Sequence, residues 1–218
     1  MKFNRLAVVG ATLFCLAGTS FAQFYGGDFD DRNGFAVDFD AYTYDDFDVT
    51  GAGLLVSDIY ANCLTNATIG VMNWEIRSGI SEGSGGILEA SGSGAITQTA
   101  TGRSGFGFDE YELRISGLAT ALAPGTYFVG VNVGDLLGAR AFVSTTSGAN
   151  SIGSPIGNGN TFLNSAFFGF TYTNWENLVG PGPWDVSYGV DGEAVPEPAT
   201  LVALGIGLAA LAARRRRS

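Results

Sequence analysis

The chain has 218 residues, and its 21 acidic residues outnumber its 11 basic ones, which gives a net charge of −10 at pH 7. It contains no histidine, so a Ser-His-Asp catalytic triad is excluded. A negative charge of this size repels phosphate groups, which excludes nucleic acid as a partner.

The first 22 residues have the pattern of a secretory signal peptide. Two basic residues precede an apolar run from Leu6 to Leu16, and small residues at Ser20 and Ala22 suit a signal-peptidase site. The run is far shorter than the ~20 residues that span a bilayer, which argues against an N-terminal membrane anchor. We expect signal peptidase to cut after Ala22, so that the mature chain begins at Gln23.

The segment from Gln23 to Ala194 is more acidic than the whole chain. It carries 20 acidic residues, five arginines and no lysine, which gives a net charge of −15. Such a charge favours binding of divalent cations or of basic partners, or it keeps the protein soluble. Cys63 is the only cysteine of the segment, so no internal disulfide can form, and we expect it to be a small buried apolar side chain.

A dense set of carboxylates follows the predicted cleavage site. Its members are Asp28, Asp30, Asp31, Asp45, Asp46 and Asp48. Because Ca²⁺ prefers oxygen ligands, these residues are candidates for a structural calcium site built from loops. The first cluster is not an EF-hand loop, since Arg32 stands at its fifth position and Gly34 at its seventh. The alternative is a solvated acidic segment that binds no metal.

Short extended runs separated by Gly-rich turns fill the rest of the segment. Strands are predicted near residues 35–41, 53–60, 68–76, 86–90, 95–100, 108–115, 125–133, 139–145, 166–173 and 185–190. Ala123-Pro124-Gly125-Thr126 has the composition of a type II turn, and residues 147–160 form a longer polar loop. The alternation from Glu110 to Ile115 is typical of a half-buried strand and places Glu110 and Glu112 on its solvent face.

One all-β domain over residues 23–194 follows from these patterns. Antiparallel strands without intervening helices favour an antiparallel two-sheet sandwich of jelly-roll type, because two stacked sheets each bury one face. A β-helix is the alternative, although the sequence has no repeat of fixed period. The three tryptophans, Trp74, Trp175 and Trp184, either form a sugar-stacking platform or lie in the core. Their exposure on one face would favour carbohydrate binding, and their burial a structural role.

The end of the chain combines a tripeptide at residues 196–198, an apolar run at 201–213 and an arginine cluster at 214–217. The residues of the two polar parts are Pro196, Glu197, Pro198, Arg214, Arg215, Arg216 and Arg217. Proline fixes φ and lacks an N–H, so the tripeptide is extended and unpaired. The apolar run predicts a short membrane helix, and the arginines hold its end in the cytoplasm by the positive-inside rule.

This order of parts, over residues 195–218, resembles the PEP-CTERM sorting signal of exported bacterial proteins. The resemblance implies that the tail enters the inner membrane transiently, that an exosortase cleaves near the motif, and that the protein reaches the cell surface or the extracellular matrix. We therefore expect a surface or matrix structural protein, not an enzyme, that associates with exopolysaccharide. The alternative is a carbohydrate-binding or Ca²⁺-dependent adhesion module.

Overall fold

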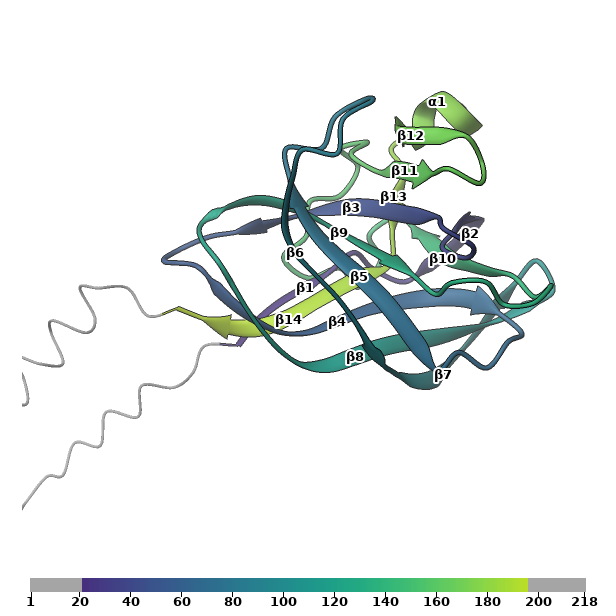
Figure 1. Cartoon of the computed structure of the whole chain (residues 1–218), viewed down its shortest axis with the longest axis horizontal. Coiled ribbons are helices and arrows are strands. Elements are labelled where there is room, and N and C mark those ends of the chain that lie inside the picture. Colours follow the sequence, from purple (N-terminus) through teal and green to yellow (C-terminus); the bar gives the residue numbers. More distant parts are fainter. Residues whose placement is uncertain (1–20, 196–218) are drawn as a thin grey trace, which may run out of the picture.

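The computed structural model describes residues 21–195, with side chains from Gln23 onward. This part of the chain forms two antiparallel sheets and one short helix (Figure 1). The predicted signal peptide and membrane helix lie outside the described residues, apart from Phe21 and Ala22. Within residues 21–195, no helix is long and apolar enough to cross a membrane.

Sheet A is built around the long strand β4. Its main order is β1 (Phe21–Tyr25), β14 (Tyr188–Ala194), β4 (Leu54–Thr65), β8 (Phe108–Leu122) and β7 (Thr97–Gly105). The end of β4 also pairs with β10 (Ala141–Thr146), which pairs in turn with β2 (Phe29–Ala36) and β13 (Asp185–Val186).

Sheet B has six strands. Their order is β12 (Phe170–Asn174), β11 (Phe162–Ser165), β3 (Tyr42–Val49), β9 (Gly125–Asn132), β5 (Val71–Ser78) and β6 (Ile87–Ala95). The helix α1 (Trp175–Val179) follows β12 and begins at the N-cap Asn174, whose side chain accepts a hydrogen bond from the Glu176 N–H.

One hydrophobic core joins the two sheets. Val56, Ile59 and Leu113 of sheet A and Met72 and Ile76 of sheet B are fully buried members of the same cluster. Alternate residues of each strand face this core, as expected for two sheets that each bury one face. The prediction of an all-β chain with two antiparallel sheets is confirmed, and the jelly-roll connectivity stays a prediction.

The N-terminal region differs from the prediction. The strand expected at residues 35–41 is wrong, because β2 ends at Ala36 and the chain turns at Phe39, which has a φ of 55°. The aspartates at 45–48 lie instead on β3, inside sheet B. Tyr44 and Phe47 flank Asp45 and Asp46 and are buried, so the burial of these two aromatic rings holds an acidic segment within the sheet.

The turn between β8 and β9 also differs in detail. It lies where the sequence predicts it, but Gly125 is not among the residues with a positive φ. A type II turn is therefore wrong, because that turn requires a positive φ at this position. Gly125 is already extended as the first residue of β9, where it pairs with Val49 of β3.

The two ends of the described chain lie side by side. Strand β1 pairs with β14 so that Phe21 is opposite Glu193, and the Val195 N–H donates to the Gly53 carbonyl over 3.0 Å. In Figure 1 the start of β1 and the end of β14 lie on the same side of the domain. The predicted cleavage site after Ala22 falls within β1, and the predicted domain boundary at Ala194 coincides with the end of β14.

Candidate functional site

An open hollow of about 320 Å³ lies on the face of sheet A that points away from the core. Side chains alternate along a strand, so Tyr60 and Asn62 of β4 and Arg114 of β8 point to this face while their neighbours enter the core. The lining residues are Gln23, Tyr25, Asp28, Tyr60, Asn62, Thr101, Arg103, Glu112 and Arg114. They come from β1, β4, β7 and β8 and from the turn that follows β1.

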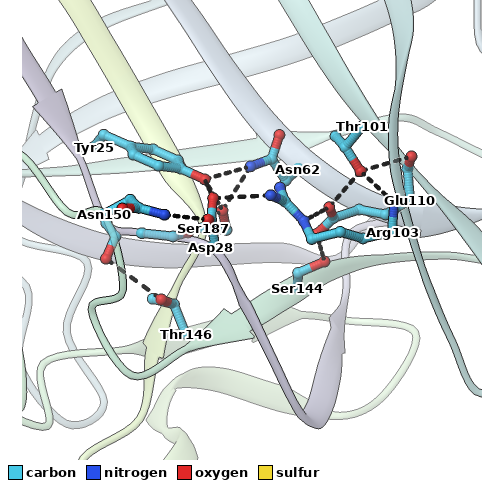
Figure 2. A network of polar contacts seen from close by, with 12 residues as sticks. Tyr25, Asp28, Asn62, Thr101, Arg103, Glu110, Ser144, Thr146, Asn150 and Ser187 are labelled. Carbon is cyan, nitrogen blue, oxygen red and sulfur yellow. Dashed lines mark hydrogen bonds and ion pairs between the residues drawn. The ribbon is translucent and has the colours of Figure 1, made fainter.

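Asp28 is the centre of a hydrogen-bond network at one end of the hollow (Figure 2). Its carboxylate accepts from the Tyr25 hydroxyl at 2.8 Å, from Arg103 at 2.9 Å and from the Asn150 amide at 2.7 Å. Burial opposes its charge, but the donors Asn150 and Tyr25 and the charge of Arg103 outweigh burial and lower the pKa of Asp28. The Asn62 amide extends the network by donating to the Tyr25 hydroxyl.

Arg103 links this network to Glu110, which is fully buried. The Glu110 carboxylate also accepts from the hydroxyls of Thr101 at 2.7 Å and Ser144 at 2.6 Å. The expectation that Glu110 lies on a solvent face is therefore wrong. The β7–β8 hairpin packs against β2 here, since Gly105 approaches the ring of Phe29 so closely that a Cβ would lie 2.5 Å from it.

A second arginine closes the other side of the hollow. Arg114 donates to Glu112 at 2.7 Å and to Asp191 at 2.6 Å, and its guanidinium lies 3.9 Å from the centre of the Tyr60 ring. The ring lies across Gly189, where a Cβ would be 1.8 Å from it. The lining of the hollow thus contains paired charges, hydroxyls and amides, all of which are groups that form hydrogen bonds.

The six predicted calcium ligands are divided between the two sheets. Asp28 and Asp30 accept hydrogen bonds from side chains of sheet A and the loop after it, and Asp31 is exposed. The other three, Asp45, Asp46 and Asp48, lie on β3 of sheet B. Within the described residues, no group of three or more acidic, cysteine or histidine side chains is arranged to hold a metal ion. A calcium response of these aspartates stays a prediction.

Three carboxylates, two of them from that set, are buried near one another. Asp45 accepts from the Val186 N–H at 2.7 Å, and Asp46 accepts from the amides of Asn158 and Asn160. Burial and the charge of Asp185 raise the pKa of Asp45 well above its usual range. Burial also raises the pKa of Asp46 and of Asp185, and one Asp185 oxygen is buried without a hydrogen-bond partner.

The tail of the chain identifies its sorting class. Residues 194–217 match the family model of the PEP-CTERM protein-sorting motif. The chain carries a PEP-CTERM motif. The motif implies an exported protein that an exosortase recognises. No curated protein and no solved structure matches the chain.

The described part of this PEP-CTERM protein keeps its tryptophans away from the hollow. Trp74 and Trp175 are buried and Trp184 is half-buried, with its ring edge-on to Phe35. Cys63 is also fully buried, as predicted, and burial raises the pKa of its thiol. Burial of the tryptophans favours a structural role over a tryptophan platform for sugars.

The hollow was not predicted from the sequence. Of its lining residues, Asp28 was expected to bind calcium and Glu112 to lie on a solvent face. One signal was available, because Arg103 and Glu110 are separated by the Gly-rich turn at Gly105–Gly107, and a hairpin there brings β7 back beside β8. The contacts of Tyr25 and Asn62 had no such signal, since these residues are 37 positions apart.

Proposed function

We propose that this PEP-CTERM protein is a structural protein of the cell surface or extracellular matrix that associates with exopolysaccharide. The observation that carries the proposal is the place of the sorting motif. The matched segment begins at Ala194, the last residue of β14, so it follows the two-sheet domain without a linker. The whole folded domain is then the cargo that the sorting pathway delivers.

The surroundings of Glu110 and Cys63 support a role without catalysis. Glu110 is fully buried and hydrogen-bonded by Thr101, Arg103 and Ser144, so its carboxylate does not face a substrate. Cys63 is buried with a raised pKa, which disfavours the nucleophilic thiolate. The sequence has no histidine to serve as a general base.

We propose the hollow on sheet A as the contact site for exopolysaccharide. Gln23 is exposed at its rim, and Glu112 lies half-buried in its lining. One Glu112 oxygen accepts from Arg114, so the Gln23 amide and the other Glu112 oxygen can bond to sugar hydroxyls. Asp28 and Arg103 are already engaged with each other and with protein donors. The carbohydrate-binding alternative, in which the domain recognises one particular glycan, would use the same hollow.

Co-sedimentation of the protein with exopolysaccharide from the producing cell tests this contact. We expect the wild type to bind and the double variant Gln23→Ala, Glu112→Ala to bind about tenfold more weakly, because two lost hydrogen bonds of about 0.5–1.5 kcal/mol each give roughly that factor. The matched control is the double variant Asp135→Ala, Leu137→Ala. Both of these residues are exposed, and each of the two double variants loses one acidic group.

Each contrary outcome of this experiment has a separate meaning. Absence of binding by the wild type would contradict the association with exopolysaccharide. Equal binding by the wild type and the Gln23 and Glu112 variant would place the contact outside the hollow. Repeating the measurement with and without Ca²⁺ tests the calcium-dependent adhesion alternative in the same samples.

A further inference from the structure

The open edges of the two sheets differ in how they are protected. Unpaired backbone groups at a sheet edge accept another strand, and proteins limit this with charges, bulges or very short strands. In sheet A, β2 carries three charged residues, β7 has a register shift before Ser104, and β1 and β13 have five and two residues. In sheet B, β12 has five residues and runs directly into α1.

Strand β6 has such protection only at its start, where Glu89 is charged and the pairing with β5 shifts register. It has nine residues, ends the order of sheet B, and pairs within the described chain with β5 alone. Its segment from Ala90 to Ala95 pairs with β5 without a register shift and contains no charged residue and no proline. The exposed side chains of Ile87 (65%) and Leu88 (46%) precede this segment. Figure 1 shows β6 running along β5 as the last strand of its sheet.

Core packing explains the choice of residues on only one face of β6, the face that points toward the core. Gly92 and Gly94 face the core, where a Cβ would lie 2.9 Å from the Trp74 ring and 2.7 Å from Ile115. Larger residues are therefore excluded at these two positions. Ser91 and Ser93 point outward and are exposed, so the core places no such limit on them, and the uncharged outer face needs another explanation.

We propose that the β6 edge is an interface with a second copy of this chain, in which two β6 strands pair antiparallel and join the two B sheets. A two-fold axis through Gly92 places Ser91 of one copy opposite Ser93 of the other, a pairing in which the hydroxyls can bond across the strands. Ala90 then lies opposite Gly94 on the core side. The same register places Glu89 opposite Ala95, so no charge faces a like charge.

The charge of the domain argues for this edge as the place of contact. Two copies of the segment from Gln23 to Ala194, with a net charge of −15 each, repel one another over most of their surfaces. The uncharged six-residue segment of β6 lets their backbones approach with little added repulsion. Pairing at the β6 edge of sheet B does not depend on whether the hollow on sheet A binds exopolysaccharide.

Sedimentation equilibrium of the full chain in a mild detergent tests the proposal. We expect a concentration-dependent dimer in the wild type and a dissociation constant at least tenfold higher in Ser91→Lys, Ser93→Lys, because lysines at the edge block strand addition. Ser104→Lys with Ser116→Lys adds the same two charges at exposed positions of sheet A. This control should leave the dissociation constant within about twofold of the wild type.

A second measurement keeps the test valid if the lysine variant folds poorly. Single Ser91→Cys and Ser93→Cys chains, with Cys15 replaced by serine, should form disulfide-linked dimers when mixed and far fewer when kept apart; Cys63 is buried and does not compete. A wild type that stays monomeric, a dimer that the β6 lysines do not weaken, or a mixture that does not cross-link would each overturn the proposal.

Discussion

Replacement of Arg103 by alanine is expected to lower the free energy of unfolding by about 3 kcal/mol. Arg103 pairs with Glu110, whose side chain is 0% exposed, and with Asp28. Removing one partner of a buried ion pair leaves an uncompensated charge at a cost of about 3–5 kcal/mol, and the low end applies because Arg103 is itself 32% exposed. The melting temperature, followed by circular dichroism, should fall by roughly 6–12 °C.

The charge of Glu110 is the cause of this loss, and a double variant isolates it. Glu110→Gln keeps an acceptor for one of the Thr101 and Ser144 hydroxyls, and its NH₂ group can donate to the other hydroxyl oxygen. Because no buried charge is left, we expect it to cost about 1 kcal/mol. Combined with Arg103→Ala, it should recover most of the stability that the arginine variant loses. A double variant as unstable as Arg103→Ala would show that packing, and not the buried charge, causes the effect.

The melting temperature of the wild type is expected to fall by several degrees as the pH rises from about 5 to 7. The folded-state pKa values of Asp45, Asp46 and Asp185 are raised above the ordinary value of 3.8. A carboxyl with a raised pKa stabilises the fold below its unfolded pKa, and this contribution is lost as the pH rises through the folded pKa. A pKa raised by about one corresponds to ~1.4 kcal/mol of stability, and each kcal/mol changes the melting temperature by ~2–4 °C.

Asp185→Asn tests the origin of this pH dependence. Asparagine retains an acceptor for the Gly157 N–H and removes one of the three charges, so the variant should melt higher than the wild type at pH 7 and show a flatter pH profile. Asp30→Asn is the control, because hydrogen bonds from Thr145, Ser147 and Arg32 outweigh burial and lower the pKa of Asp30.

The Asp30 variant should therefore lose stability at pH 7, with a difference from the wild type that shrinks below about pH 4. Thermal melts of the three proteins between pH 3 and 8 provide the comparison. A wild-type melting temperature that is constant from pH 5 to 7, or an Asp185→Asn variant that melts below the wild type at pH 7, would contradict the assignment.

Most of the sheet structure could be predicted because it is local. Runs of β-branched and aromatic residues between Gly-rich turns mark β4 to β10 and β12 to β14, and each of these strands overlaps a predicted one. Strand β3 was missed because four of its residues, from Tyr44 to Phe47, are buried without a clean alternation of polar and apolar types. Its place depends on pairing with β9, about 80 residues away.

The candidate site was predicted less well because its contacts are not local. Asn62 donates to Ser187, which is 125 positions away, and no periodic pattern in the sequence links such residues. The six aspartates show the converse, since residues that are close in sequence are divided between the two sheets. Asp45 and Asp46 point to opposite faces of β3, while Asp185, which influences the pKa of Asp45, comes from β13.

Processing at both ends is the central expectation for a PEP-CTERM protein with this architecture. The measurement that tests it most directly is the intact mass and terminal sequence of the mature protein, recovered from the surface or matrix fraction of the producing cell. We predict that it begins at Gln23 and ends near Pro196–Pro198, without the apolar run and the arginines at 214–217. Mature protein that retains residues 6–16 or the arginine cluster, or that stays inside the cell, would contradict the account.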